Sequence, residues 1–263
     1  MRFALGLEYD GSAFHGWQTQ QDGVRTVQNC LERALSLVAN QPTEVVVAGR
    51  TDAGVHAGNG GNYGQVVHFD TTVHRPLRAW VLGSNFHLPH DIAVRWVRMV
   101  RDDFHARFSA RARHYRYVIY NGPTRPALDR TRVTWDHRPL DVAAMADAAR
   151  SLIGTHDFSS YRAQGCQAKS PVRTLHRLEV IREGSHGNIV IEAVANAFLH
   201  HMVRNLAGVL LAIGAGEHSP EWAREVLERR DRSQGGITAP PTGLYLVGVE
   251  YPPEFGVPPE TTW

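Results

Sequence analysis

Cysteine is scarce in this sequence: only Cys30 and Cys166 occur among its 263 residues. Two cysteines are too few for a disulfide framework or a cysteine-based zinc site, and such usage is typical of a reducing compartment. Long apolar runs are also missing, since the longest, such as residues 209–213, are far shorter than a membrane span. Residues 1–9 contain no extended apolar stretch, which argues against a signal peptide or an anchor. We therefore expect a cytoplasmic protein.

Lysine is almost absent as well: of the 28 lysines and arginines, only Lys169 is a lysine. The formal net charge is +2, so the chain as a whole is not strongly basic, although one face of it can be. Arginine binds phosphates through paired hydrogen bonds and stacks on bases, which suits RNA. A codon bias toward arginine explains the same excess without RNA, so composition alone leaves both interpretations open.

The proportions of apolar and charged residues, 43% and 21%, are those of a folded globular protein. The first half of the chain predicts the element order β-α-β-β-α-β, from alternating or β-branched strands and from apolar residues at helical spacing. The two helices are expected to begin at Thr26, which is a capping residue, and at Pro76. The predicted strands cover residues 2–9, 44–48, 65–69 and 92–100.

The second half repeats this order and adds one helix. Its helices are expected from Asp141, over 200–213 and over 220–229, and its strands over 113–120, 175–182, 188–195 and 244–251. Residues 252–263 contain four prolines and no periodicity, which predicts an irregular tail. The prediction is an α+β fold of two related ferredoxin-like halves, 1–105 and 106–263, that form an extended antiparallel sheet with a central catalytic cleft.

One short string, GRTDAGVH at residues 49–56, presents a carboxylate, a guanidinium and an imidazole directly after a predicted buried strand. Its glycines permit tight turns and a close approach of the backbone. In such a loop Asp52 can act as a nucleophile or as a base. The alternative, which is common in loops, is a capped turn in which Asp52 accepts backbone N–H bonds and Arg50 is solvated. Composition and spacing leave both alternatives open.

Five strings, spread over almost the whole chain, carry a resemblance to one family. They are GSAFHGWQ at 11–18, GRTDAGVH at 49–56, DFHARFSA at 103–110 with YRY at 115–117, FLHHMVRN at 198–205, and GLYL at 243–246. On these strings the sequence resembles the TruA family of tRNA pseudouridine synthases. The fold of that family, two related α/β halves around a central cleft, agrees with the predicted element order.

The resemblance implies an isomerase that converts uridines at positions 38, 39 and 40 of the tRNA anticodon stem-loop to pseudouridine. The N-glycosidic bond is cut, the uracil is turned and rejoined through C5, and no cofactor is consumed. The family is typically homodimeric, with one tRNA touching both subunits. Asp52 aligns with its essential aspartate, which either attacks C1′ or removes the C2′ proton. A uridine in a stem must first leave its stack, at a cost of a few kcal/mol.

Four further residues of these strings are expected around the substrate, and two of them, Tyr115 and Arg204, align with family residues. Arg50 is expected to fill the space that the flipped base leaves or to hold its phosphate. Tyr115 aligns with the active-site tyrosine, and its ring is expected to stack on the uracil, contributing about 1–3 kcal/mol by analogy with other base stacks. Arg204 is expected to pair with Asp52 and keep it ionised and in place. Leu244 is expected to form an apolar wall against the base.

Each of these residues also has a plainer interpretation. Tyr115 can be a half-buried strand residue, although Tyr117 and Tyr120 suit that role better. Because Tyr117 shares a face with Tyr115 by the two-residue period of a strand, the two tyrosines can exchange roles. Arg204 can reach solvent along its aliphatic stem. Leu244 can be an ordinary core residue.

The fifteen histidines invite a metal interpretation. His200 and His201 are adjacent, so within a helix their rings would point about 100° apart and would not readily share one ion. His56 and His68 have no carboxylate–histidine spacing typical of zinc sites. We therefore expect no metal.

The connection at residues 57–64 departs from the family pattern. It is rich in glycine and about five residues longer than is usual in the family, as in a mobile linker. Tyr63 within it is a candidate RNA contact, and a merely longer turn is the alternative. The string that carries Asp52 is intact, so the expected reaction is unaffected.

Two other functions fit parts of the pattern. A non-catalytic RNA-binding protein with tandem ferredoxin-like modules also binds RNA through the aromatics of its sheets, but it gives no reason for Asp52 between Arg50 and His56. A carboxylate glycosidase normally needs a second acid about 5–10 Å away, and no other loop here is as distinctive. Incubation with tRNA distinguishes the three functions. A synthase forms pseudouridine, a glycosidase releases free uracil, and an RNA-binding protein binds without either change.

Overall fold

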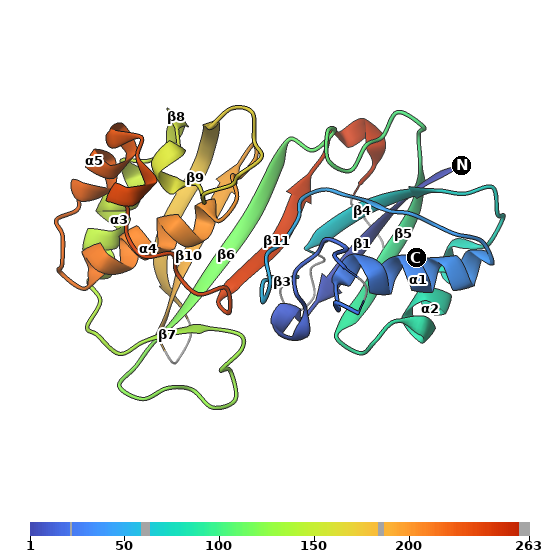
Figure 1. Cartoon of the computed structure of the whole chain (residues 1–263), viewed down its shortest axis with the longest axis horizontal. Helices are drawn as coiled ribbons and strands as arrows, with labels where there is room; N and C mark the ends of the chain where they lie inside the picture. Colours follow the sequence, from blue (N-terminus) through green and yellow to red (C-terminus); the bar gives the residue numbers. More distant parts are fainter. Residues whose placement is uncertain (22, 59–63, 184–186, 258–263) are drawn as a thin grey trace. The chain divides into compact units, whose positions relative to one another are not determined.

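The computed structural model describes residues 1–21, 23–58, 64–183 and 187–257, and the chain separates into two compact units (Figure 1). The first unit comprises Met1–Ala112 and Tyr245–Trp263, and the second comprises Arg113–Leu244. The predicted halves, 1–105 and 106–263, describe a repeat of element order, which packing does not test. Packing groups the last strand, from Tyr245 on, with the first unit, in which it pairs with His56 and Ala57.

The sheet of the first unit is built around its amino-terminal strand. β1 (Arg2–Tyr9) lies between β4 (Gln65–Asp70) and β5 (Ile92–Val100) and is antiparallel to both. β2 (Val46–Val47) pairs with the far side of β4. β3 (His56–Ala57) joins the carboxyl end of β1 and runs parallel to β11 (Leu244–Glu250). Of the predicted strands, 44–48 shrinks to the two residues of β2, whereas 92–100 is confirmed at both ends.

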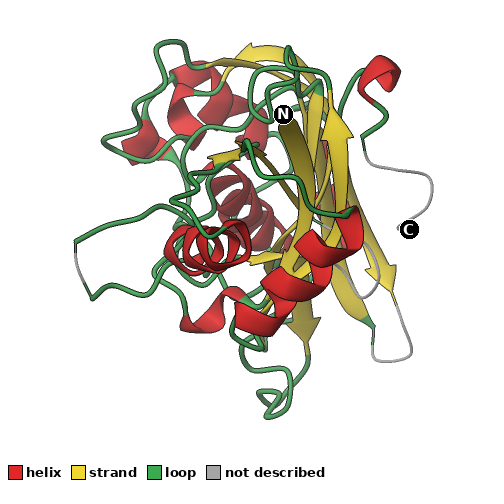
Figure 2. Ribbon diagram, turned by 90° about the vertical axis from the view of Figure 1, so that its right-hand side faces the viewer, coloured by secondary structure: helices red, strands yellow, loops and turns green. Residues whose placement is uncertain are grey.

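Two helices cover one face of this sheet (Figures 1 and 2). α1 (Val27–Ala39) begins after Thr26, whose hydroxyl accepts the N–H of Asn29, as expected of a cap. α2 (Leu77–His87) begins after Pro76, as predicted. The two helices therefore start where their capping and proline signals place them.

The core beneath these helices is aromatic. Phe3 of β1 stacks on Phe69 of β4, with ring centroids 5.5 Å apart, and its ring lies 5.8 Å from that of Trp80 on α2. All three side chains are buried. Burying a side chain of this kind stabilises a fold by roughly 1.5–3 kcal/mol, so this cluster fixes α2 against the sheet.

The strands of the second unit lie in the order β6 (Ala112–Asn121), β10 (Asn188–Ala195), β9 (Val172–Glu183) and β8 (Gly154–Asp157), each antiparallel to the next. β7 (Thr134–Asp136) pairs in parallel with β6. The three predicted strands here are confirmed. β7, β8 and β3 were not predicted, because segments of two to four residues are too short to show an alternation.

Three helices belong to the second unit. α3 (Val142–Arg150) is capped by Asp141, whose carboxylate accepts the N–H groups of Ala143 and Ala144. α4 (Met202–Gly214) and α5 (Trp222–Arg229) follow the two long strands. The prediction that α4 begins at residue 200 is wrong by two residues, because His201 has a left-handed backbone with φ of 59° and lies outside the helix.

The predicted α+β class is confirmed, but the prediction of a wholly antiparallel sheet is wrong. β3 and β11 run parallel, and so do β6 and β7. The predicted irregular tail contains one short helical turn, Pro253–Phe255. Among the described residues, every helix is too short or too polar to reach across a bilayer.

The connection after β5 is held by two buried or half-buried histidines. His68 of β4 accepts the N–H of Ala106 at its Nδ1, at 3.1 Å. Nδ1 of His105 accepts the N–H groups of Arg107 and Phe108, each at 3.1 Å. A protonated imidazole carries hydrogens on both nitrogens and cannot accept these bonds. The segment 104–108 is therefore built for neutral histidines.

This arrangement predicts that stability falls in acid. Burial, together with the positive charge of Arg2, lowers the pKa of His68 to about 4, and the same causes lower the pKa of His105. In the unfolded chain histidine titrates near pH 6.5, so between pH 6.5 and 4 the unfolded state binds more protons and the free energy of unfolding decreases, by at most roughly 3 kcal/mol for His68. Denaturant unfolding as a function of pH measures this slope. His68→Asn, which keeps an acceptor, should flatten it, and an unchanged slope would contradict the assignment.

Candidate active site

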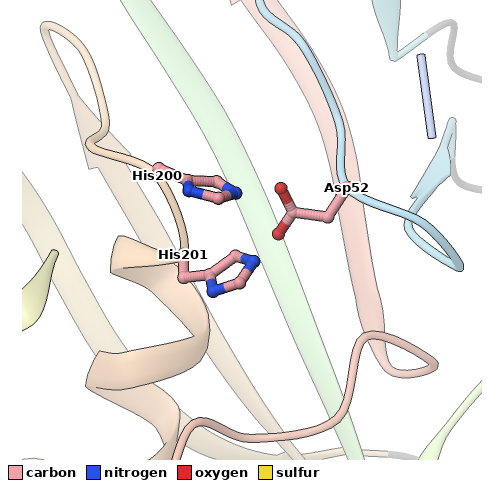
Figure 3. A group of neighbouring side chains, drawn as sticks. All are labelled: Asp52, His200 and His201. Atoms are coloured by element: carbon pink, nitrogen blue, oxygen red, sulfur yellow. The ribbon is translucent and has the colours of Figure 1, made fainter. Parts of the chain in front are cut away.

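Asp52 is carried by the loop between β2 and β3. Its side chain is half-buried, whereas that of Arg50 is exposed. The turn is closed by backbone groups: the N–H of Val55 donates to the carbonyl oxygen of Asp52 at 3.2 Å, and Gly54 has a φ of 79°. Figure 3 shows the carboxylate extending from this loop. The turn, closed by a backbone bond, thus presents an acid at the surface of the first unit.

The segment 11–18 packs against this loop. The N–H of Trp17 donates to the carbonyl oxygen of Thr51 at 3.0 Å. Gly16 has a φ of 88°, and a Cβ at this position would lie 2.9 Å from that same oxygen and 3.2 Å from the carbonyl carbon of Asp52. A residue with a side chain would therefore push the loop away. Two of the strings found in the sequence form one local structure around Asp52.

His56, to which the sequence assigned no role, is a buried structural residue. Its Nδ1 accepts the N–H of Gly11 at 3.1 Å and lies 3.2 Å from the carboxylate of Asp10. Its ring stacks on Tyr245 of β11, with centroids 4.7 Å apart. His56 therefore ties the end of the Asp52 loop to two other segments of the first unit. In the sequence, the only signal for this structural role of His56 is its position at the end of GRTDAGVH, since no spacing to another residue distinguishes it.

In the second unit, the structure distinguishes the two tyrosines of β6. Tyr117 is fully buried, and its hydroxyl is 2.6 Å from Oγ1 of Thr134 and donates to the carbonyl oxygen of Pro240 at 3.0 Å. Burial strongly raises the pKa of Tyr117. Tyr115 is half-buried, and its ring meets Phe198 edge to face at 5.0 Å. Of the pair, Tyr115 is the one whose ring is accessible.

Arg204 lies in the first turn of α4 and is half-buried. Its Nε donates to the carbonyl oxygen of Ala239 at 2.8 Å, and the N–H of Ala239 donates back to the carbonyl oxygen of Arg204 at 3.1 Å. One turn further on, Gly208 lets this segment approach α4, since a Cβ there would lie 1.8 Å from the carbonyl oxygen of Ile237. These contacts fix the direction of the Arg204 stem. Its pairing with Asp52 stays a prediction.

Leu244 begins β11 and is only 5% exposed. Its N–H donates to the carbonyl oxygen of Pro241 at 2.9 Å. The residue before it, Gly243, accepts the N–H of Val118 at 2.8 Å, and a Cβ at Gly243 would lie 2.4 Å from the carbonyl oxygen of Val118. Leu244 is thus already buried in the structure. Its contact with a base therefore stays a prediction.

His200 and His201 do not lie within a helix, so the expectation that their rings point about 100° apart is wrong. His200 and His201 precede α4, and the left-handed backbone of His201 brings their rings to a centroid distance of 4.0 Å (Figure 3). A helix would have directed them apart. The carbonyl oxygen of His200 accepts the N–H of Ala163, and that of His201 accepts the N–H of Asn205, both at 2.9 Å. The two rings thus form one imidazole pair at the start of α4.

Known proteins are similar to this chain over nearly its full length. A family model described as tRNA pseudouridine synthase matches residues 7–109 and 148–252. The tRNA pseudouridine synthase A of Alcanivorax borkumensis is 60% identical over 259 residues, which cover 98% of this chain and 94% of that protein. The protein of the same name from Pseudomonas aeruginosa is 61% identical over 257 residues, covering 98% and 88%. That of Nitrosococcus oceani is 59% identical over 267 residues, covering all of both chains.

The matched segments contain most of the candidate site. Arg50, Asp52, Arg204 and Leu244 lie within them, whereas Tyr115 lies in the gap between the two segments. The assignment of Tyr115 therefore rests on its string in the sequence and on its accessibility in the structure. Tyr63 and the centre of the connection 57–64 lie outside the described residues.

Proposed function

Because the chain belongs to the tRNA pseudouridine synthase family, it is an isomerase, and we propose that it converts uridines 38, 39 and 40 of the tRNA anticodon stem-loop to pseudouridine, with Asp52 as the essential residue. The reaction breaks the bond between C1′ and N1, makes a bond between C1′ and C5, and moves one proton from C5 to N1. Atoms balance within the substrate, so no co-reactant is required.

The observation that carries the proposal is the placement of Asp52. Its carboxylate stands half-buried on a turn closed by backbone bonds, and the segment 11–18 supports that turn from one side. A fixed carboxylate suits both routes: attack on C1′ with formation of a covalent ester, or removal of the C2′ proton. Both routes return the carboxylate unchanged when the C1′–C5 bond has formed.

The first unit also supports a role for Arg50 at the substrate. Arg50 is exposed two residues before Asp52 on the same loop. We assign its guanidinium to the space that the flipped uridine vacates or to the phosphate beside it, since guanidinium groups both stack and bind phosphate bidentately. A tRNA substrate is supported by the family description. The assignment of Arg50 agrees with it, because a free uracil or nucleoside has neither a base stack nor a phosphate for the Arg50 guanidinium to bind.

The second unit supplies the remaining proposed contacts. Tyr115 stacks on the uracil, Arg204 pairs with Asp52 and holds it in place, and Leu244 forms an apolar wall. The support for Arg204 is that two bonds to Ala239 already direct its side chain. The support for Tyr115 is that Tyr117, the alternative residue, is buried and its hydroxyl is hydrogen-bonded to Thr134 and Pro240.

We also assign both units to the ferredoxin-like type, the protein to a homodimer, and its location to the cytoplasm. The first unit supports the fold assignment, because its strand order β2-β4-β1-β5 with α1 and α2 on one face is that of a split β-α-β pair. The dimer rests on the resemblance to the family. The cytoplasm is where tRNA is modified and where two free cysteines remain reduced.

The direct test is incubation of the purified protein with an unmodified tRNA transcript, followed by carbodiimide mapping of pseudouridine. We expect modification confined to positions 38–40 of transcripts with a uridine there. Binding without modification would instead indicate an RNA-binding protein, and release of free uracil would indicate a glycosidase.

A second prediction separates the two tyrosines of β6. Tyr115→Ala should lower the rate of pseudouridine formation by roughly 5- to 150-fold, which corresponds to the 1–3 kcal/mol of a base–aromatic stack. Tyr117→Phe should instead lower the free energy of unfolding by about 1 kcal/mol through its lost hydrogen bonds, with little change in rate. Single-turnover rates and denaturant unfolding of both variants measure this. The reverse pattern would mean that Tyr117 is the substrate contact.

A further inference from the structure

The residues of the Asp52 loop alternate between anchored and displayed positions. Arg50 is exposed and Asp52 is half-buried, whereas Thr51, between them, is only 7% exposed. Gly49 and Thr51 are both held from beneath by side chains of the sheet. Residues 49 and 51 are thus held by the sheet, whereas the side chain of Arg50 between them is exposed and that of Asp52 after them is half-buried.

The anchors are two buried polar side chains on neighbouring strands. Nε2 of Gln65, on β4, donates to the carbonyl oxygen of Gly49 at 2.8 Å. The hydroxyl of Tyr9, at the end of β1, is 2.8 Å from Oγ1 of Thr51. Gln65 also donates a longer bond of 3.4 Å to the Tyr9 hydroxyl. Gln65 is 0% and Tyr9 3% exposed, so these bonds lie away from competing water.

Only the bonds of Gln65 have a fixed direction. Its amide nitrogen donates to the carbonyl oxygen of Gly49 and to the oxygen of Tyr9, whereas either hydroxyl can be the donor between Tyr9 and Thr51. Burial raises the pKa of Tyr9 to about 12, so the phenol keeps its hydrogen at neutral pH. A chain of hydrogen bonds therefore joins Gln65 and Tyr9 to Thr51, the residue before Asp52.

A purely structural core would not need these groups. Burying an amide and a hydroxyl costs free energy unless both find partners, and apolar residues would pack there without that cost. The partners that Gln65 and Tyr9 find are Gly49 and Thr51, which flank Arg50 and immediately precede Asp52. Gln65 and Tyr9 thus stabilise the position of the Asp52 loop.

We propose that Tyr9 and Gln65 are positioning residues, which act through Thr51 and Gly49 to hold the Asp52 carboxylate at its reacting distance. This inference rests on the proposed function, because it concerns the same acid. A displacement of a catalytic group by about 1 Å can cost 100-fold in rate, so loosening the loop should be visible in the chemical step.

The test compares Tyr9→Phe with the wild-type protein in single-turnover pseudouridine formation at saturating enzyme. The expected result is a rate 10- to 100-fold lower, with the Kd for tRNA changed by less than about twofold, because the loss is in alignment rather than in contact area. Thr51→Val should reproduce the loss, and Thr51→Ser, which keeps the hydroxyl, should restore the rate. The double variant Tyr9→Phe with Thr51→Val should be no slower than either single variant.

A matched control is available in the same unit. The hydroxyl of Tyr251 is also buried and donates to the carbonyl oxygen of Ala106 at 2.7 Å, outside the Asp52 loop. Tyr251→Phe makes the same chemical change as Tyr9→Phe, so it should lower the melting temperature comparably but leave the single-turnover rate unchanged. If Tyr9→Phe fails to fold, the pair Thr51→Val and Thr51→Ser decides.

Two results would overturn the inference. One is wild-type turnover by Thr51→Val or by folded Tyr9→Phe, and the other is an equal loss of rate in Tyr251→Phe. Either leaves the proposed function intact, because the wild-type protein in the same assay still forms pseudouridine. Failure of the wild-type protein to form any would instead remove the proposed function and this inference with it.

Discussion

Asp52→Asn is expected to abolish pseudouridine formation and to leave tRNA binding nearly unchanged. The substitution keeps the size of the side chain and removes its charge. The turn should survive, because the bond that closes it joins the N–H of Val55 to the backbone carbonyl of Asp52. If Asp52 transfers a proton, the loss is about 10²- to 10⁴-fold, and if it is the nucleophile the loss approaches about 10⁶-fold. Single-turnover mapping and a filter-binding Kd measure the two effects.

The control for this variant is Asp70→Asn. Asp70 belongs to the same unit, and its carboxylate accepts two hydrogen bonds from Arg2, at 2.7 and 2.9 Å. We assign this surface ion pair no role in the reaction. Its loss should therefore lower only the free energy of unfolding, by no more than about 1 kcal/mol. Pseudouridine formation by Asp52→Asn within tenfold of wild type would refute the role of the acid. A large loss of tRNA affinity in Asp52→Asn would refute the prediction that Asp52 acts in the reaction and contributes little to binding.

The sequence predicts the elements whose signals are local. β5 shows a flanking turn at each end and is confirmed over Ile92–Val100, and α1 starts after the cap at Thr26. The sequence does not predict which strands pair in parallel, because pairing depends on segments far apart in the chain. β11 illustrates this: its alternation reveals a strand, but its parallel partner β3 has only two residues. Local chemistry therefore identifies elements, and tertiary pairing arranges them.

Sequence motifs identified the candidate site, and the structure adds the hydrogen bonds and backbone conformations that motifs do not reveal. Periodicity puts Tyr115 and Tyr117 on one face of β6, and only the hydrogen bonds of Tyr117 to Thr134 and Pro240 show which of them is structural. The left-handed backbone of His201 is equally invisible in sequence, because a non-glycine residue gives no signal for a positive φ. Each of these features depends on contacts with residues distant in the chain.

Arg204→Ala is the second substitution with a large expected effect. If the guanidinium holds Asp52, its removal should lower the rate of pseudouridine formation by roughly 10²- to 10³-fold, as when one preorganised electrostatic partner is lost from an active site. The Kd for tRNA should change much less. Arg204→Lys keeps a charge but not the planar fork, and its Nζ cannot both reach Ala239 and pair bidentately, so only partial recovery is expected.

The structural cost of this substitution can be separated from its effect on chemistry. Loss of the bond from Arg204 Nε to Ala239 removes one hydrogen bond, which should lower the free energy of unfolding by about 1 kcal/mol. Arg224→Ala, on α5 of the same unit, removes a guanidinium that pairs with Glu228 at 2.7 Å and serves as the matched control. A rate loss in Arg204→Ala far beyond that of Arg224→Ala, at comparable stability, requires a role at the acid. Equal and small losses would instead support the plainer interpretation, in which Arg204 reaches solvent along its aliphatic stem.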